Sequence, residues 1–272
     1  MKGRGACRWP FLLWSVSMER IDELQRGGFR LIQDPDKFCF GTDAVLLADF
    51  AKAKAGEKVC DLCTGTGVIP LLMLARYPGS FYTGVEIQPD MAEMAERSMI
   101  LNDVEDKIRI LGGDLRRIRF MLPANSFDVV TVNPPYMKVR PDSLKNDSSS
   151  VSLARHEIAC SLSDVMAAAK FLLRTHGHFY MVHRPSRLSE IFEEMLKAGI
   201  EPKRMQLVYP YRDKEATQVL IEGTLGGGKE MRIEPPLITY EAPGVYTEEM
   251  LKVYGMDGHN RKTADSKGGE WS

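Results

Sequence analysis

The chain of 272 residues is 44% hydrophobic and 27% charged, and its formal net charge is −1. This composition is typical of a soluble globular protein with one large domain, alone or with appendages. No apolar stretch is long enough to cross a bilayer, so we expect no membrane association. The near-neutral charge neither supports nor opposes a nucleic-acid partner, and only a local cluster of basic residues would indicate one.

The five cysteines form an odd set. Cys60 and Cys63 have the spacing of a metal-binding or redox pair, but no second pair or histidine cluster completes a zinc site. Both also lie on or just after a predicted buried strand. We therefore expect reduced thiols, no metal and a cytoplasmic location.

The first seventeen residues begin with basic side chains, followed by the short apolar run Trp-Pro-Phe-Leu-Leu-Trp. Pro10 interrupts this run, and no small-residue cleavage site follows, as a secretory signal would require. We interpret residues 1–17 as a wrongly assigned start, with translation beginning at Met18, or as a disordered leader. Residues 18–39 then form an N-terminal segment.

From about Phe40 the chain alternates helical and strand patterns with short connections, which is typical of a parallel α/β sheet. Thr42 or Asp43 is a candidate N-cap for the first helix. The predicted helices cover residues 44–48, 69–76, 89–102, 162–174 and 187–198. The predicted strands cover residues 58–62, 81–85, 108–111, 127–132 and 178–182, and two antiparallel strands follow at 205–209 and 217–222.

Three consecutive glycines, at 226 to 228, mark the end of this pattern. We predict a catalytic domain over residues 40–225, a C-terminal extension over 226–254 and a disordered tail over 255–272. Within the domain, the polar segment 137–153 is expected to be a mobile functional loop.

An Asn-Pro-Pro-Tyr turn, residues 133 to 136, follows the fourth predicted strand. The two prolines fix φ at consecutive positions and keep the residues before them extended, so the turn is stiff. It places an amide oxygen and a backbone carbonyl where they can accept two N–H bonds from a planar amine, beside a ring that can stack. By itself, the tetrapeptide is also compatible with an ordinary proline-rich strand exit.

Acidic residues stand at the ends of the three preceding strands. Asp61 opens a Gly-x-Gly turn, but Pro70 occupies the place of the third glycine of a nicotinamide fingerprint. Asp61 also suits an ammonium group better than a pyrophosphate. Glu86 can accept both hydroxyls of a ribose, and Asp114 lies where an adenine amino group would be expected. Ligands bind outside the carboxyl ends of parallel strands, so the three acids and the Asn-Pro-Pro-Tyr turn predict one shared site.

The order of these motifs resembles the class I S-adenosylmethionine-dependent methyltransferases that methylate amino groups. More narrowly, residues 33–36, 38–47, 154–157 and 182–185 are similar to the bacterial valine-tRNA adenine-N6 methyltransferases, whose members modify the adenine at tRNA position 37. The similarity runs from about Ile21 to Tyr246. It implies a Rossmann-like α/β fold with a seven-stranded, mostly parallel sheet and helices on both faces.

The resemblance implies S-adenosylmethionine as the cofactor, with no metal and no covalent enzyme intermediate. It assigns the ribose to Glu86 and the adenine to Asp114. The residues around the methionine moiety would be Gly41, Thr42, Asp61, Gly65, Thr66 and Gly67.

The resemblance also implies that the amine of a flipped adenine binds in the Asn-Pro-Pro-Tyr turn. Two acceptors, Asn133 Oδ1 and the Pro134 carbonyl, would take its two hydrogens, and Tyr136 would stack on the base. The catalytic set is then Asn133, Pro134, Pro135 and Tyr136. His156 and His183 could act as general bases, but the surplus proton on the methylated amine can leave to water, so RNA contact or packing is the preferred explanation for both.

A tRNA partner requires basic residues near this turn. The candidates for RNA binding are Lys138, Arg140, Arg155 and Arg184, and scattered solvated charge is the alternative for each. No obligatory protein partner is evident.

Other substrates remain open, because the same turn serves guanine-N2 methylation of ribosomal RNA and glutamine-N5 methylation of release factors. Release-factor enzymes carry a helical domain before the catalytic one, and barely forty residues precede it here. DNA adenine methyltransferases usually carry a target-recognition insertion, for which there is no room. A function of a different class is a cofactor-binding RNA chaperone with little catalysis. The presence of Asn133 and Tyr136, both expected to act in catalysis, argues against it.

Overall fold

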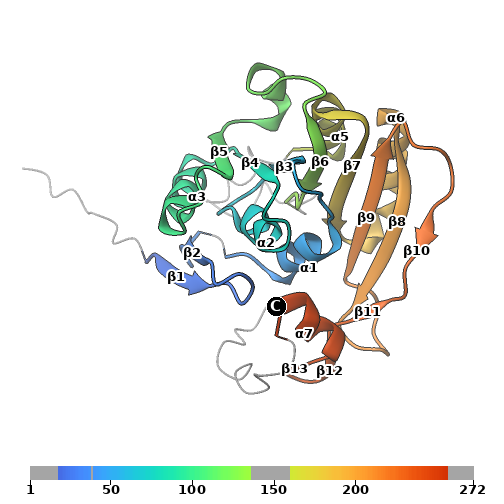
Figure 1. The fold of residues 1–272 in the computed structure, drawn as a ribbon. Helices are drawn as coiled ribbons and strands as arrows, with labels where there is room; N and C mark the ends of the chain where they lie inside the picture. The colour runs from blue at the N-terminus through green and yellow to red at the C-terminus, as the bar shows by residue number, and fades with distance from the viewer. Residues whose placement is uncertain (1–17, 38, 136–159, 257–272) are drawn as a thin grey trace, which may run out of the picture.

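The computed structural model describes residues 18–37, 39–135 and 160–256, and all structural statements concern these residues. Their centre is a nine-stranded sheet in the order β10-β8-β9-β7-β6-β3-β4-β5, with β11 also paired to β8 (Figure 1). Five neighbouring strands run parallel. They are β3 (Lys58–Leu62), β4 (Phe81–Glu86), β5 (Ile108–Gly112), β6 (Phe127–Val132) and β7 (Leu173–His183).

The other half of the sheet reverses direction. β9 (Gln218–Leu225) pairs antiparallel with β7, and β8 (Ile200–Tyr209) pairs antiparallel with β9. Two short strands, β10 (Arg232–Ile233) and β11 (Leu237–Ile238), run parallel to β8. The seven expected strands and their mostly parallel arrangement are confirmed, and the two short strands extend the sheet beyond them.

Helices cover both faces of the sheet, as expected (Figure 1). One face packs against α1 (Thr42–Phe50), α2 (Val68–Arg76), α3 (Pro89–Leu101) and α7 (Glu248–Tyr254). The other face packs against α5 (Leu162–Leu172), α6 (Leu188–Ala198) and the 3-10 helix η1 (Leu115–Phe120). Successive residues of a strand point to opposite faces, so Val129 and Val130 of β6 belong to different hydrophobic clusters.

Local sequence explains where several of these elements begin. Every residue of β6 is buried, as a continuous apolar run in the middle of a parallel sheet should be. Pro89 stands at the start of α3, where its missing N–H costs nothing. Ser161 and Asp164 form a reciprocal capping box at the start of α5. No helix in the described part of the chain combines the length and hydrophobicity that crossing a bilayer requires.

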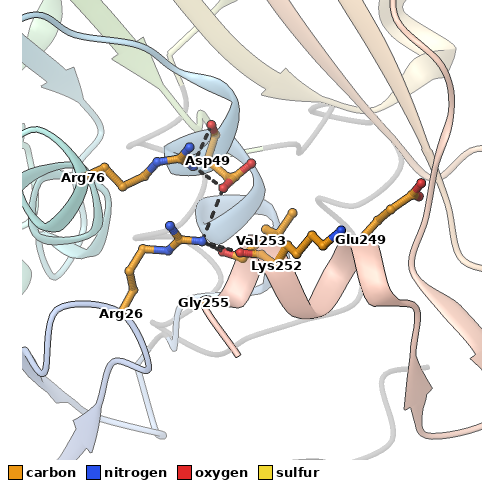
Figure 2. A pocket seen from close by; sticks show the side chains of 7 residues that line it. All are labelled: Arg26, Asp49, Arg76, Glu249, Lys252, Val253 and Gly255. Atoms are coloured by element: carbon orange, nitrogen blue, oxygen red, sulfur yellow. Dashed lines mark hydrogen bonds and ion pairs between the residues drawn. The ribbon is translucent and has the colours of Figure 1, made fainter. Parts of the chain in front are cut away.

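An N-terminal hairpin of β1 (Arg20–Glu23) and β2 (Arg30–Gln33) packs beside α3. Its tip joins a group of charged residues that we call the Arg26 cluster: Arg26, Asp49, Arg76 and the last carbonyls of α7 (Figure 2). Arg26 and Arg76 both pair with the Asp49 carboxylate, and Arg26 also donates to the carbonyls of Lys252 and Val253. A further short hairpin, β12 (Tyr240–Ala242) and β13 (Val245–Tyr246), precedes α7.

The Arg26 cluster lies at the end of the sheet away from the strand carboxyl ends. α2 starts beside the carboxyl end of β3 and runs from there to Arg76, and Arg76 meets Asp49 in the last turn of α1. The cluster lines an open cavity of about 580 Å³. The charged side chains of the cluster form ion pairs and hydrogen bonds with one another. We therefore interpret the cavity as a gap where the hairpin, α1, α2 and α7 meet, and not as the site predicted from the sequence.

Candidate functional site

The carboxyl ends of four adjacent strands bring the predicted polar residues to one edge of the sheet. In sheet order these strands are β5, β4, β3 and β6. Backbone bonds tie the connecting loops together: Thr64 N donates to the Val85 carbonyl at 3.1 Å, and Gly113 N donates to the Glu86 carbonyl at 2.7 Å. Residues that are far apart in the sequence therefore share one site.

The turn between β3 and α2 has an unusual backbone. Cys63, Gly65 and Gly67 all adopt positive φ, at 58°, 57° and 83°. Such a conformation is strained for a residue with a side chain, and strain of this kind concentrates at functional sites. A Cβ at Gly67 would also lie 2.8 Å from Met99 Cε, the flexible end of that side chain, so the positive φ is the main reason for the second glycine.

Asp61, at the end of β3, is a buried acid with an unused acceptor. Its side chain is 1% exposed, and Oδ1 accepts a 2.6 Å hydrogen bond from the Thr131 hydroxyl. Oδ2 is buried and has no hydrogen-bond partner among the described residues. Burial raises the pKa of Asp61 to about 7, the Thr131 and Thr64 hydroxyls oppose this rise, and the nearby Glu86 carboxylate adds to it. A cationic ligand group would satisfy Oδ2 and hold the carboxyl ionised.

Glu86, at the end of β4, connects two loops. Its side chain is buried, and Oε2 accepts from Gly65 N at 2.9 Å while Oε1 accepts from Gln88 N at 2.9 Å. Oε1 also accepts from Gln88 Nε2 at 3.3 Å, so of the roughly four lone-pair sites of the carboxylate it is Oε2 that retains capacity for a ligand hydroxyl. The structure therefore places Glu86 between the glycine turn and the start of α3, with both carboxyl oxygens held in place.

Asp114 follows β5 and is the N-cap of η1. It accepts from Arg116 N at 2.9 Å and forms an ion pair with the Arg116 guanidinium at 2.6 Å. Hydrogen bonding from the Arg116 side chain lowers the pKa of Asp114. The half-exposed carboxylate is therefore ionised, but a ligand amine would have to share it with Arg116.

Asn133 follows β6 and is half-buried, with Pro134 buried and Pro135 exposed behind it. Its Nδ2 donates to Asp43 Oδ2 at 2.9 Å, which joins the Asn-Pro-Pro-Tyr turn to the first turn of α1. The expectation that Thr42 or Asp43 caps α1 is wrong: the N-cap is Gly41, and Thr42 is already the first helical residue. Asp43 was not among the site residues predicted from the sequence. Gly41 and Thr42, which precede Asp43 in the same Gly-Thr-Asp motif, were among them.

Several predicted residues lie outside the described residues, namely Tyr136, Lys138, Arg140, Arg155 and His156. Arg184 is exposed directly after β7, at the same end of the sheet as Asn133. His183 beside it is 1% exposed, and burial followed by the charge of Arg187 lowers its pKa to about 4. A buried neutral imidazole cannot contact RNA directly, so packing explains His183 better.

The described residues fit S-adenosylmethionine as a bound group. The unsatisfied Asp61 Oδ2 matches an ammonium group, and the glycine turn lets a ligand approach the backbone. Thr66 is buried within that turn, whereas Gly41 and Thr42 lie at the start of α1, next to Asp43. The three acids span β3, β4 and β5 in the order in which the ammonium, ribose and adenine groups of such a ligand would follow one another.

Comparison with known proteins identifies methyltransferases as similar proteins. A family model described as a methyltransferase domain matches residues 59–146. A tRNA1(Val) (adenine(37)-N6)-methyltransferase of Histophilus somni is 32% identical over 220 residues, covering 75% of this chain and 91% of the relative. A protein of the same name from a Flavobacteriaceae bacterium is 26% identical, covering 82% of this chain and 93% of the relative.

Solved structures show the same fold at low sequence identity. A crystal structure of a predicted O-methyltransferase from Agrobacterium tumefaciens has a TM-score of 0.64 at 22% identity, covering 81% of this chain and all of the other. A geranyl diphosphate methyltransferase in complex with S-adenosylmethionine has a TM-score of 0.52 at 16% identity, covering 68% of this chain and 84% of the other. The Rossmann-like methyltransferase fold is thereby confirmed.

Proposed function

We propose a function for this chain from its family, since it belongs to the tRNA1(Val) (adenine(37)-N6)-methyltransferases. The chain is an S-adenosylmethionine-dependent methyltransferase whose substrate is the exocyclic N6 of adenine 37 in a valine tRNA. One observation carries this proposal beyond the family name. Asn133, an acceptor for an amine, stands at the sheet edge that also holds the buried and unsatisfied Asp61.

On the cofactor side, each acid has a role that its environment supports. Asp61 would bind the ammonium group through Oδ2, Glu86 the ribose hydroxyls and Asp114 the adenine amine. Gly65, Thr66 and Gly67 would enclose the methionine moiety, with Gly41 and Thr42 near its carboxylate. S-adenosylmethionine, when bound, supplies a methyl group on a positively charged sulfur, so no metal and no covalent enzyme intermediate are needed.

On the substrate side, the turn prepares a poor nucleophile. The lone pair of an adenine amine is delocalised into the ring, and Asn133 Oδ1 together with the Pro134 carbonyl would accept both of its hydrogens. Two such bonds favour tetrahedral geometry at nitrogen and stabilise the positive charge that develops there. Tyr136 would stack on the flipped base, Pro135 keeps the turn stiff, and the surplus proton leaves to water.

The tRNA would approach the same end of the sheet. Arg184 supports this placement because it is exposed there, and Lys138, Arg140 and Arg155 remain predicted RNA contacts. A tRNA substrate also places the enzyme in the cytoplasm. Ribosomal guanine and release-factor glutamine are the substrates that must be excluded by experiment, because the turn alone does not discriminate among planar amines.

The test offers the purified protein labelled S-adenosylmethionine with valine tRNA, ribosomal RNA, DNA and a release factor in separate reactions. We expect label on the tRNA, recovered as N6-methyladenosine at position 37, and no label on a tRNA with guanine there. Asn133→Ala should remove this label while leaving cofactor binding intact. Label on the release factor or ribosomal RNA alone would contradict the proposal, as would tRNA labelling that Asn133→Ala does not reduce.

A further inference from the structure

We infer that Asp43 is a positioning residue for methyl transfer, because its carboxylate orients the Asn133 amide. This inference rests on the proposed function and deepens it. The sequence does not indicate that the two residues are in contact, because they are 90 positions apart. The 2.9 Å bond from Asn133 Nδ2 to Asp43 Oδ2 brings them together where α1 begins and β6 ends.

The chemistry of the two groups leaves only one orientation. An amide has a donor end and an acceptor end of nearly equal shape, and an isolated asparagine can present either one. A carboxylate only accepts hydrogen bonds, so the end of Asn133 that faces Asp43 must be Nδ2. A flipped amide would place Oδ1 against a carboxylate oxygen and leave both acceptors without a proton. Asp43 therefore turns Oδ1 of Asn133 away from itself, in the orientation that the proposed acceptor role requires.

Asp43 is itself held in place. Its other oxygen, Oδ1, accepts from Ala44 N at 3.0 Å, within the first turn of α1, where the helix dipole favours negative charge. The helix that carries it is buried from Ala44 through Ala48, so its position relative to the sheet is rigid. The carboxylate is thus fixed by one oxygen and orients Asn133 with the other.

Gly41 has a specific place in this arrangement. A Cβ built on Gly41 would lie 2.7 Å from Asp43 Oδ1, closer than side-chain carbons approach other atoms. A larger residue at position 41 would push the carboxylate away from Ala44 N and thereby from Asn133. The glycine of the Gly-Thr-Asp motif leaves room for Asp43, whether or not it also approaches the cofactor.

Orientation affects the transition state more than the bound substrate. Donation from Nδ2 to a charged acceptor polarises the amide and strengthens Oδ1 as an acceptor. The amine needs that acceptor most when its nitrogen becomes positive during transfer. Loss of Asp43 should therefore lower kcat, while KM for either substrate changes little.

The test compares Asp43→Ala and Asp43→Asn with the wild-type enzyme in steady-state methylation of valine tRNA. Asp43→Ala should lower kcat about 100-fold and Asp43→Asn about 10-fold, because the asparagine variant can still accept from Nδ2 but no longer excludes the flipped amide. KM for tRNA and the Kd of S-adenosylmethionine should stay within about threefold in both variants.

Gly41→Ala should also lower kcat, because its Cβ would displace the Asp43 carboxylate. Asp49→Asn is the matched control, because it removes a carboxylate from the same helix at its opposite end, and kcat should be unchanged.

Double variants test whether Asp43 acts through Asn133. If it does, adding Asp43→Ala to Asn133→Ala should cost less than twofold further in kcat. The exchange Asp43→Asn with Asn133→Asp restores a donor facing an acceptor, so it should exceed Asn133→Asp alone by at least about 10-fold. Additive losses, no rescue by the exchange, or an Asp43→Ala enzyme within twofold of wild-type kcat would overturn the inference. A wild-type enzyme that does not methylate tRNA would instead refute the proposed function.

Discussion

The two ends of the central sheet differ in how their charged side chains are paired. At the amino end, the charged groups of the Arg26 cluster are all paired: Asp49 forms ion pairs with two arginines, and Arg26 also donates to the carbonyls that end α7. At the carboxyl end, Asp61 Oδ2 is buried without a hydrogen-bond partner in the described part of the chain, and Cys63 adopts a left-handed backbone. Unsatisfied buried groups are rare in native proteins, so the buried Asp61 oxygen indicates that the carboxyl end binds a ligand, whereas the paired charges of the Arg26 cluster indicate a structural role.

This contrast predicts the largest effect at Asp61. Asp61→Asn removes the carboxylate that a cationic ligand would neutralise, so the Kd of S-adenosylmethionine should rise about 100-fold, measured by calorimetry. The same change removes an unpaired buried charge. The melting temperature without cofactor should therefore be equal to or higher than that of the wild type at pH 8. An Asp61→Asn protein that is less stable than the wild type but binds S-adenosylmethionine equally well would show that Asp61 is a structural residue, which would contradict the contrast between the two ends of the sheet.

A smaller effect should appear as a pH dependence of cofactor affinity. The pKa of Asp61 is raised to about 7 in the free protein, so the carboxyl is mostly protonated at pH 6 and mostly ionised at pH 8. A cationic ligand lowers that pKa, and its binding must release a proton below pH 7. Affinity should fall about 10-fold from pH 8 to pH 6 and level off above pH 8. The Asp61→Asn variant provides the control, because its affinity should lose this dependence.

The smallest effect on activity is expected at the amino end. Arg26→Ala removes the hydrogen bonds to the end of α7 and one of the two arginines beside Asp49. Stability should fall by about 1–2 kcal/mol, which lowers the melting temperature of a chain of this size by roughly 3–6 °C. Methyl transfer per folded molecule should stay within twofold of the wild type. A larger loss of kcat in the folded variant would show that the two ends are coupled.

Much of the fold follows from local pattern. The strands at 58–62 and 127–132 were predicted to the residue, because each is a short, nearly continuous apolar run between turn signals. The helix predicted to end at 174 ends at Leu172, and β7 begins at Leu173, well before the predicted 178. Leu173 pairs with Phe127 of β6, and such a distant pairing overrides local helix preference.

The candidate site divides in the same way. Asp61, Glu86, Asp114 and Asn133 were predicted because each lies at or just after the end of a strand, and strand ends are recognisable from sequence. Asp43 was missed because its position in the first turn of a helix suggests a cap. Its actual partner is 90 residues away and becomes adjacent only when α1 packs beside β6.

The amino-acid sequence by itself determined the class of the protein, its seven main strands, its cofactor and the row of polar residues at the strand ends. These features depend on periodicity and on short motifs, which act over a few residues of chain. Only the tertiary structure decided which contacts join distant segments, namely the bond by which Asp43 orients Asn133 and the bond from Arg26 to the end of α7, 227 positions away. It also decided that Asp61 Oδ2 is buried without a partner among the described residues. Such contacts depend on burial and on three-dimensional proximity, and neither is encoded in the spacing of residues along the chain.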